Sequence, residues 1–364
     1  MLISWEMRTA DFDFDLPEEL IAQTPAPRRD QSRLLVLQRS TEKIKHRQFR
    51  DLLEFLRTGD VLVLNNSRVI PARLRGTNTV SRGHFEILLL EENAVNDWWA
   101  MLRPGRRARV GTRIRLKDLH ENPTELHAVV VATNDEGHRR LRFSGTPNII
   151  GELDSTGEVP LPPYISRSAG HELEEDKARY QTVFAQPPGS VAAPTAGLHF
   201  TNELLQEIQQ RGVQVCFVTL HVGLGTFAPV KSETIAGHRM HEERFELDSE
   251  TAQAVNAAKN DGRRVVAVGT TTVRVLESVA ATHDGTVVAG AGRTRIFIHP
   301  PYHFRIVDAL LTNFHLPRST LLMLASAFAA PDETRGREML LAAYREAIRE
   351  RYRFFSYGDA VLLL

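Results

Sequence analysis

Four segments in which small and polar residues follow or interrupt an apolar run constrain the fold of this chain more than any other feature. Three are strand-like runs that break into glycine, threonine, histidine or asparagine, at residues 215–227, 265–274 and 309–320. The fourth, residues 190–201, is a run of small residues ahead of a helix. Because ligands bind beyond the carboxyl ends of strands in open α/β sheets, these segments predict one shared site.

Helices alternate with these strands in the second half of the chain. The pattern predicts helices at 202–211, 250–259, 272–281, 319–329 and 337–351, and strands at 213–220, 265–268, 295–298 and 305–312. Earlier in the chain it predicts strands at 33–37 and 61–64 and a helix at 49–56. Such alternation is typical of helices that cross between mainly parallel strands, so we expect an α/β fold with a layered, mainly parallel sheet.

Residues 73–155 have a different pattern. Short β-type runs recur there between turn signals such as Pro-Gly and Asp-Glu-Gly, with almost no helical periodicity. Regularly spaced short strands indicate a small all-β barrel or sandwich. Because the α/β pattern resumes afterwards, we predict an inserted barrel-like domain at 73–155 within a discontinuous α/β domain formed by 1–72 and 156–364.

The basic residues are concentrated locally rather than globally. Lys plus Arg and Asp plus Glu are both 45, so the net charge attracts no nucleic acid. The densest basic cluster lies at 103–115 and includes Arg103, Arg106, Arg107 and Arg109, and a smaller one is Arg28-Arg29. The larger cluster is either a platform for RNA phosphates or a solubilising rim, and the smaller is either an RNA contact or a solvated turn.

Several classes of protein are disfavoured. The single cysteine, Cys216, lies in an apolar run typical of a buried thiol in a reduced compartment. We see no signal peptide, and the most apolar run, 320–330, is too short to span a bilayer, so we expect a cytoplasmic protein. The sequence Gly-Leu-Gly at 223–225 lacks the remaining features of a dinucleotide fingerprint. His238 and His241 have the spacing of metal ligands but no accompanying motif, so no metal is expected.

Three histidines, His199, His221 and His315, are predicted at strand or loop ends. Imidazole titrates near neutral pH, which suits acid–base chemistry or the orientation of a substrate. The alternative for each is a core histidine that donates to a backbone carbonyl. The turn Thr270-Thr271-Thr272, which opens a helix, offers hydroxyl and backbone N–H groups for a carboxylate or a ribose.

Longer motifs connect these features to a known family. They include P-T-A-G-L-H-F-T, T-L-H-V-G-L-G-T-F, A-V-G-T-T-T-V-R-V-L-E-S, L-L-T-N-F-H-L-P-R-S-T and Y-R-F-F-S-Y-G-D-A, with L-N-N-S-R-V-I-P-A-R-L in the N-terminal half. In this order they closely resemble the S-adenosylmethionine:tRNA ribosyltransferase-isomerases of queuosine biosynthesis, from about Met7 to the C-terminus. One departure is Pro301, where the family pattern has glycine before Tyr302.

The resemblance implies a reaction and its partners. The ribosyl part of S-adenosylmethionine is transferred to the aminomethyl group of 7-aminomethyl-7-deazaguanine (preQ1) at the tRNA wobble position. It is isomerised to an epoxycyclopentanediol, which gives epoxyqueuosine, adenine and methionine. S-adenosylmethionine is then a consumed cosubstrate, no further cofactor is needed, and acid–base groups suffice. We expect a monomer.

The resemblance also suggests roles for individual residues. The acid–base groups would come from His199, His221 and His315. Arg274 would pair with the methionine carboxylate. The residues expected to bind the substrate are Thr195, Gly197, Gly223, Gly225, Thr270, Thr271, Thr272, Arg274, Glu277 and Asn313. The tRNA would contact Arg28, Arg29, Arg103, Arg106, Arg107 and Arg109.

Two other functions remain open from the sequence. A tRNA methyltransferase would use the same donor but leave S-adenosylhomocysteine, and the chain lacks the usual glycine loop of such enzymes. A noncatalytic RNA-binding protein would bind tRNA through the basic barrel without consuming the donor, which would leave the four polar segments unexplained.

Overall fold

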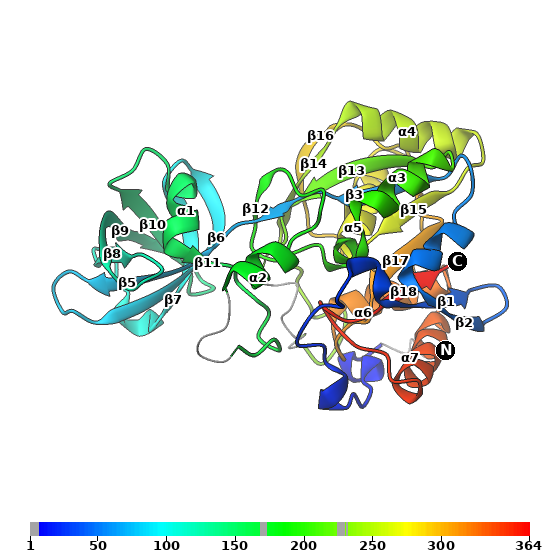
Figure 1. The fold of residues 1–364 in the computed structure, drawn as a ribbon, viewed down its shortest axis with the longest axis horizontal. Helices are drawn as coiled ribbons and strands as arrows, with labels where there is room; N and C mark the ends of the chain where they lie inside the picture. The colour runs from blue at the N-terminus through cyan, green and yellow to red at the C-terminus, as the bar shows by residue number, and fades with distance from the viewer. Residues whose placement is uncertain (1–6, 168–172, 224–229, 231) are drawn as a thin grey trace, which may run out of the picture.

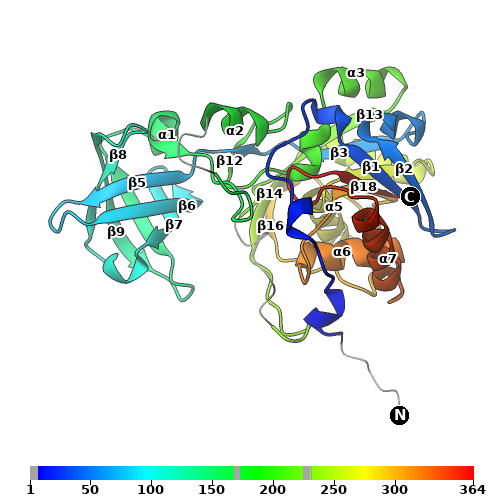
Figure 2. The same ribbon diagram turned by 60° about the horizontal axis from the view of Figure 1, so that its bottom comes forward.

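The computed structural model describes residues 7–167, 173–223, 230 and 232–364. A large helix-covered sheet forms one part of the molecule, and a small barrel lies beside it (Figure 1). Turning the molecule shows the barrel still set apart from the sheet (Figure 2). Among the helices of the described ranges, none is both long and apolar enough to cross a membrane.

The large sheet contains nine strands within the described ranges, in the order β16-β14-β13-β3-β15-β17-β18-β1-β2. These strands are β1 (Arg33–Gln38), β2 (Lys43–Gln48), β3 (Val61–Asn65), β13 (Gln214–Leu220), β14 (Glu243–Leu247), β15 (Val265–Val268), β16 (Gly290–Thr294), β17 (Ala309–Asn313) and β18 (Ala360–Leu363). The central strands β13, β3, β15 and β17 are parallel to one another. Antiparallel pairs flank this centre, so the sheet as a whole is mixed.

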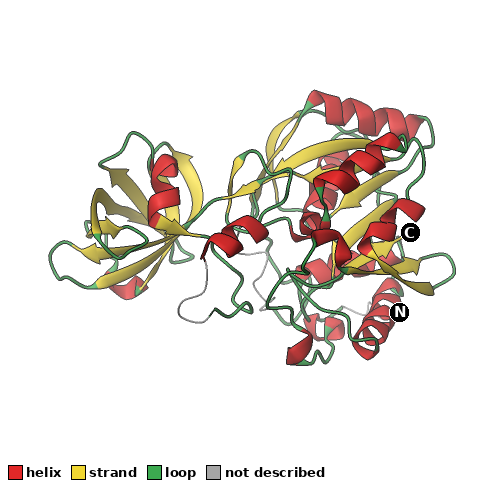
Figure 3. Ribbon diagram, viewed as in Figure 1, coloured by secondary structure: helices red, strands yellow, loops and turns green. Residues whose placement is uncertain are grey.

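Helices cover both faces of this sheet (Figure 3). The α-helices of the described ranges are α1 (Leu153–Thr156), α2 (Leu173–Arg179), α3 (Asn202–Gln210), α4 (Ser249–Asn260), α5 (Thr270–Thr282), α6 (Thr320–Ala329) and α7 (Gly336–Arg349). Apolar side chains of α4, α5, α6 and α7 share one core with one face of the sheet. The opposite face packs against α3 and two 3-10 helices, η4 (Phe49–Glu54) and η7 (Thr195–His199). Burial of both faces explains why the central strands are apolar throughout.

The second sheet closes into a barrel. Its strands are β5 (Arg73–Asn78), β6 (His84–Ala94), β7 (Asp97–Arg103), β8 (Arg113–Lys117), β9 (Pro123–Thr133), β10 (Arg139–Ser144) and β11 (Gly157–Glu158). The order is β11-β5-β6-β7-β10-β9-β8, and pairing of β5 with β8 closes six of the strands. Alternate residues such as Leu74, Ile87 and Leu141 fill the interior. The predicted α/β fold with an inserted barrel is confirmed, while the division into domains at 73 and 155 stays a prediction.

Shorter elements connect the two sheets. A two-stranded parallel ladder joins β4 (Arg68–Val69) to β12 (Pro188–Ser190). The remaining 3-10 helices of the described ranges are η1 (Thr9–Phe12), η2 (Glu18–Leu20), η3 (Arg29–Gln31), η5 (Gly105–Arg107) and η6 (Ile149–Glu152). The ladder therefore links the chain that enters the barrel to the segment that precedes η7.

Two local predictions need correction. The helix predicted at 49–56 is the 3-10 helix η4, in which Phe49 and Leu52 are buried. The prediction of a strand at 295–298 is wrong, because the strand in this part of the chain, β16, ends at Thr294. The register pairs Thr294 with Glu243, the first residue of β14, so β16 ends where its partner strand begins. Pro301, at the position expected to be glycine, follows Pro300 through a cis peptide bond.

Candidate active site

The carboxyl ends of β3, β13, β15 and β17 lie at one edge of the large sheet, because these strands are parallel. Three of the polar segments found in the sequence follow β13, β15 and β17 directly. The fourth segment contains η7 and lies against the same edge, because Ala196 of η7 lies close to Gly269, the residue after β15. A Cβ added to Gly269 would lie 3.6 Å from the Cβ of Ala196. The structure therefore places the four segments at one edge of the large sheet, while the shared site predicted for them stays a prediction.

Asn65, the last residue of β3, connects three of these strand ends. Its side-chain amide donates to the carbonyl of Leu220 (3.0 Å) and to the hydroxyl of Thr271 (3.3 Å). Its Oδ1 accepts from the backbone N–H groups of Leu220 and Ser67, both at 3.1 Å. One buried amide therefore holds the end of β13 and the N-terminus of α5 in fixed positions.

Ser190 anchors the start of the loop that leads to η7. Its hydroxyl donates to Ser67 Oγ (2.8 Å) and accepts from the backbone N–H of Val222 (2.9 Å). Asn65, Ser67 and Ser190 were not among the residues predicted from the sequence to form the site. The run Val61–Asn65 breaks into polar residues as the other strands do, so the same signal was available for Asn65 and Ser67.

His199, at the end of η7, is buried and has a partner for each ring nitrogen. Its Nε2 lies 3.1 Å from Asn313 Nδ2, and its Nδ1 lies 2.7 Å from Ser32 Oγ. The ring stacks on Phe49, with 4.9 Å between centroids. Burial, followed by the charges of Arg353 and Arg29, lowers the pKa of His199 to about 3. The imidazole is therefore neutral at physiological pH.

These contacts fix the tautomer of His199. Asn313 Nδ2 also donates to the carbonyl of Phe355 (3.2 Å), so this amide nitrogen is a donor and His199 Nε2 is an acceptor. The proton of the neutral ring is then on Nδ1 and is donated to Ser32. Asn313 Oδ1, by contrast, is buried without a hydrogen-bond partner among the described residues.

His221 follows β13 and is much less restrained. Its Nδ1 is buried and has no hydrogen-bond partner in the described part of the chain. Desolvation, followed by the charge of Arg244, lowers its pKa. Gly189 lies so close that an added Cβ would be 2.8 Å from Nδ1, so only glycine leaves room for this ring. The lowered pKa favours the neutral imidazole, whose buried Nδ1 lies against Gly189.

His315 lies on the opposite face of the sheet from His199. Asn313 points towards His199, so the side chain of Thr312, the preceding residue of β17, points to the other face of the sheet. His315 Nε2 lies 3.0 Å from the hydroxyl of Thr312, and its backbone N–H donates to the hydroxyl of Tyr344 on α7 (2.9 Å). Burial lowers the pKa of His315 to about 3. The structure does not bring this histidine together with His199.

Arg274, in the second turn of α5, is a buried cation beside the loop that follows β13. It forms an ion pair through Nη1 with Glu243, and the two side chains are only 4% and 7% exposed. Glu243 also accepts from the backbone N–H of Gly223 (3.2 Å). The Nε and Nη2 atoms of Arg274 have no hydrogen-bond partner among the described residues. One edge of the guanidinium is therefore free to bind an acceptor.

Glu277, one turn later, is occupied by the protein itself. Its carboxylate accepts from the backbone N–H groups of Arg305 (2.9 Å), Ile306 (3.0 Å) and Val307 (3.0 Å). Burial nevertheless raises its pKa. These contacts give Glu277 a role in holding the segment before β17.

The remaining predicted substrate-binding residues differ in exposure. Thr270, Thr271 and Thr272 are buried at the start of α5, and the hydroxyl of Thr272 donates to the carbonyl of Val268 (2.8 Å). Gly197 is packed so tightly that an added Cβ would lie 2.9 Å from both Thr182 and Phe184. Thr195, the first residue of η7, is half-buried. Gly225 lies outside the described residues.

A small cavity of about 20 Å³ adjoins His199. Its lining includes Arg29, Arg179, Ser32 and Tyr357 but not His221, Thr271 or His315. The Arg29 guanidinium donates to the carbonyls of Leu198 (3.1 Å) and Ala178 (2.9 Å), and so points inward towards η7. The cavity therefore does not join the residues proposed for catalysis into one space.

The four barrel arginines predicted to contact tRNA all lie at the surface. Arg103, Arg106, Arg107 and Arg109 are exposed on and around η5. Arg139 supports this turn from behind by donating to the carbonyls of Gly105 and Ala108, both at 2.7 Å. Within the described ranges, the four surface arginines form no ion pair. Arg28 is also exposed but lies 3.4 Å from Asp30.

Neither the thiol nor the described histidine, cysteine and carboxylate side chains form a further chemical centre. Cys216 is buried in β13, as predicted, and burial raises its pKa to about 11. Over the residues that the structure describes, no group of three or more histidine, cysteine, aspartate or glutamate side chains could hold a metal ion. His241 instead lies 3.7 Å from Glu136 of the barrel.

Comparison with known proteins gives consistent matches along the whole chain. The family model described as "Queuosine biosynthesis protein" matches residues 9–363. Two proteins named S-adenosylmethionine:tRNA ribosyltransferase-isomerase are similar over 358 residues, 98% of this chain and 100% of theirs. The protein from Heliobacterium modesticaldum is 51% identical and that from Carboxydothermus hydrogenoformans is 52% identical.

A solved structure is similar as well. It is the crystal structure of S-adenosylmethionine tRNA ribosyltransferase from Thermotoga maritima, which is 38% identical in sequence. The match covers 97% of this chain and 100% of that chain, with a TM-score of 0.53.

Proposed function

Because this chain belongs to the family of queuosine biosynthesis proteins, we propose that it is an S-adenosylmethionine:tRNA ribosyltransferase-isomerase. The observation that carries this proposal is identity of 51% and 52% to two enzymes of that name over their full lengths. The enzyme transfers the ribosyl group of S-adenosylmethionine to preQ1 in tRNA and isomerises it to the epoxycyclopentanediol. Adenine and methionine are the other products.

The vacant edge of Arg274 supports binding of the methionine part of the donor. Nε and Nη2 form the side-on fork of a guanidinium, which matches the two oxygens of a carboxylate. The fork is buried, so a carboxylate bound there would be shielded from water. Glu243 fixes the other side of the guanidinium and so leaves this edge presented for the ligand.

Among the three histidines, His221 has the contacts best suited to proton transfer. A base must remove a proton from the carbon beside the sulfonium, and it must be neutral to do so. The pKa of His221 is lowered, and its buried Nδ1 has no hydrogen-bond partner among the residues that the structure describes. His199 uses both ring nitrogens in protein contacts, so we assign it the positioning of the Asn313 amide. His315 is placed to support β17 from the other face.

The tRNA would approach through the barrel. The arginines at 103, 106, 107 and 109, which form no ion pair with any described residue, supply positive charge for phosphates without sequence preference. The wobble nucleotide of an anticodon loop can be turned out of its stack and read in a pocket. We also propose that the enzyme acts as a monomer in the cytoplasm and that it needs no cofactor besides the consumed donor.

Product analysis tests this function. The purified protein is incubated with S-adenosylmethionine and tRNA that carries preQ1, and the products are identified by mass spectrometry. Free adenine and methionine with a mass increase in the tRNA are expected. Formation of S-adenosylhomocysteine would identify a methyltransferase instead, and binding of tRNA without consumption of the donor would identify a noncatalytic RNA-binding protein.

A further inference from the structure

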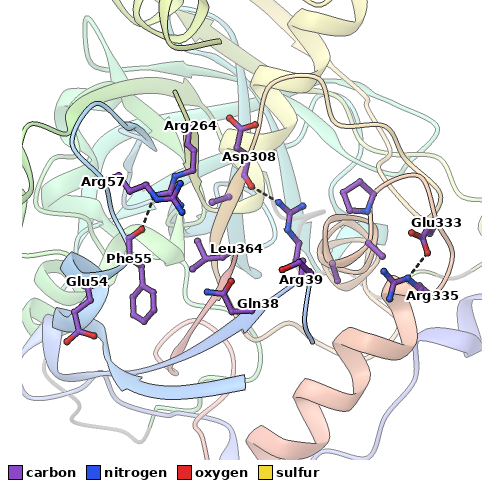
Figure 4. A pocket seen from close by; sticks show the side chains of 15 residues that line it. Gln38, Arg39, Glu54, Phe55, Arg57, Arg264, Asp308, Glu333, Arg335 and Leu364 are labelled. Atoms are coloured by element: carbon purple, nitrogen blue, oxygen red, sulfur yellow. Dashed lines mark hydrogen bonds and ion pairs between the residues drawn. The ribbon is translucent and has the colours of Figure 1, made fainter. Parts of the chain in front are cut away.

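Arginines that line a cavity at the edge of the large sheet opposite the candidate active site are bound by nearby groups of the protein. This cavity of about 600 Å³ is bordered by the end of β1, the starts of β15 and β17, and the end of α6 (Figure 4). Arg39 donates to the carbonyls of Phe328 (3.1 Å) and Asp308 (2.6 Å), and Arg264 donates to Asp60 (2.5 Å). These charges are therefore satisfied within the part of the molecule that contains the large sheet.

Arg293 of β16, by contrast, connects the large sheet to the barrel. Its Nη2 donates to Glu91 of β6 in the barrel, and its Nη1 donates to Glu242 (3.1 Å), the residue before β14. A second approach lies in the turn between β9 and β10, where Glu136 is 3.7 Å from His241. The barrel and the large sheet have separate apolar cores, and parts joined in this way are expected to move relative to each other unless a further contact restrains them.

Arg293 and Arg244 form a pair of like charges on one face of the large sheet. The register places them directly opposite each other on β16 and β14, so both side chains project from the same face. Like charges in such a pair repel, and two consecutive glutamates of the barrel offset this repulsion. Glu91 pairs with Arg293. Burial raises the pKa of Glu92, and the charge of Arg244 counteracts that rise. The barrel therefore presents two carboxylates to two opposed arginines.

A β-bulge in β6 gives Glu91 the direction that this contact needs. Leu89 is buried in the barrel interior and pairs with Ala100, which is also buried. Glu91 pairs with Trp99, so Leu90 is an extra residue between the two pairs. Trp99 precedes the inward-facing Ala100 and so points outwards, as does Glu91 opposite it. Without the bulge, strict alternation after Leu89 would turn Glu91 into the barrel.

The strand that carries Arg244 also carries contacts of the candidate active site. Glu243, its neighbour on β14, points to the other face and forms the ion pair with Arg274. The backbone carbonyl of Arg244 accepts from the backbone N–H of His221 (3.0 Å). A barrel held at Arg244 and Arg293 is therefore held beside the residues proposed to bind the donor and to transfer the proton.

We propose that Arg293 is a positioning residue, which fixes the orientation of the barrel relative to the candidate active site. The chain attaches the barrel near the ladder of β4 and β12, and the contact with Glu91 is a second attachment that restricts rotation about the first. Resting on the proposed function, the inference extends to the substrate: Arg293 sets the direction from which a tRNA bound to the barrel reaches the site. A partly exposed ion pair adds little to global stability, so its loss changes this orientation rather than folding.

Charge reversal and charge exchange test this role. Arg293→Glu places a carboxylate beside Glu91 and so repels the barrel. Adding Glu91→Arg exchanges the two charges and should restore their attraction. Arg295→Glu is the matched control, because it makes the same change of charge two residues away, and the ion pair of Arg295 is with Glu242 (3.1 Å) rather than with the barrel.

The orientation of the barrel is measured without tRNA. Spin labels are attached to the full-length protein at Val110→Cys on the barrel and Ala342→Cys on α7, two exposed positions, while Cys216 is buried. Double electron–electron resonance then gives the distribution of distances between the labels. We expect one narrow distribution for the parent protein and for Arg295→Glu, a broader or shifted one for Arg293→Glu, and recovery of the narrow one in the exchanged pair.

Kinetics with tRNA that carries preQ1 measure the consequence for the reaction. Arg293→Glu should raise KM for tRNA about three- to tenfold more than Arg295→Glu does. The kcat at saturating tRNA and KM for S-adenosylmethionine should change by less than about twofold, because the site itself is intact. The exchanged pair should recover most of the affinity for tRNA.

The proposal is overturned if Arg293→Glu leaves the distances between the labels unchanged, or if Arg295→Glu alters them equally. A rise in KM that the exchanged pair does not recover, with unchanged distances, would mean that Arg293 contacts the tRNA directly. Adenine release by the unmodified protein tests the catalytic function separately. Its absence would refute that function, whereas the distances would still report the orientation of the barrel.

Discussion

Replacing Arg274 by lysine tests whether its free edge binds the donor carboxylate. Lysine keeps the positive charge beside Glu243, which limits damage to the fold, but it lacks the two-pronged guanidinium. Hydrogen bonds to charged groups contribute about 1.5–3 kcal/mol each, and lysine retains one of the two at best. We therefore expect kcat/KM for S-adenosylmethionine to fall about 10- to 150-fold.

The assay compares two donors so that damage to the protein can be separated from loss of the contact. Adenine release is measured for both proteins with S-adenosylmethionine and with its decarboxylated analogue. Because the analogue has no carboxylate for the fork, we expect Arg274→Lys to change its kcat/KM by less than about threefold. Arg345→Lys, on the exposed side of α7, is the control. Equal losses with both donors would refute the carboxylate contact.

Three further predictions follow from the buried imidazoles and the basic surface. His199 has a pKa of about 3 when folded and about 6.5 when unfolded, so the unfolded chain binds the proton first and stability falls as the pH drops below 6.5. Denaturant unfolding should show that His199 lowers the free energy of unfolding by about 2–3 kcal/mol between pH 6.5 and 4.5, and His199→Gln should abolish this part of the pH dependence. The same pH dependence in His199→Gln and in the unmodified protein would contradict the prediction. Gly189 has a φ of +144°, and Gly189→Ala should push the His221 ring aside. We expect the rate of adenine release to fall about tenfold or more while the affinity for tRNA stays the same. Full activity would show that the glycine has no such role. Reversing the charges of Arg106 and Arg107 together should weaken tRNA binding. The slope of the logarithm of the binding constant against the logarithm of the salt concentration should become shallower by about 1–2. Unchanged binding would show that this face of the barrel does not contact tRNA.

The order of elements could be predicted from the sequence because local patterns determine it. The α3 helix begins after Thr201, whose hydroxyl accepts from the backbone N–H of Leu204, and its apolar residues lie on one face. The strands β13 and β15 are apolar runs of the expected length, and the barrel strands alternate buried and exposed residues. These signals depend on neighbouring residues alone.

The errors arose where distant residues decide the structure. The end of β16 is set by the start of its partner β14, more than forty residues earlier in the chain. The apolar residues of η4 are buried by contacts with β1 and η3, and this short segment is a 3-10 helix rather than the expected α-helix. A strand or helix boundary fixed by its partner has no marker in the local sequence.

The polar residues of the candidate site were only partly predictable for a related reason. The segments after β13, β15 and β17 were recognisable because they follow apolar runs. Ser32, however, precedes its strand and reaches His199 from 167 residues away. Its role depends on β1 being parallel to β18 at the far side of the sheet, which the sequence does not reveal. The site residues named from sequence stay predictions, with roles now constrained by their contacts.

The contacts of the three histidines decide which of them can exchange a proton with a substrate. An imidazole whose nitrogens both bind protein groups must break a hydrogen bond before it can act, and a buried one cannot replace that bond with water. This applies to His199, which lies between Ser32 and Asn313. Nδ1 of His221 has no hydrogen-bond partner among the described residues, so no hydrogen bond of this nitrogen has to break first. These contacts favour our proposal that His199 fixes geometry and that His221 exchanges the proton.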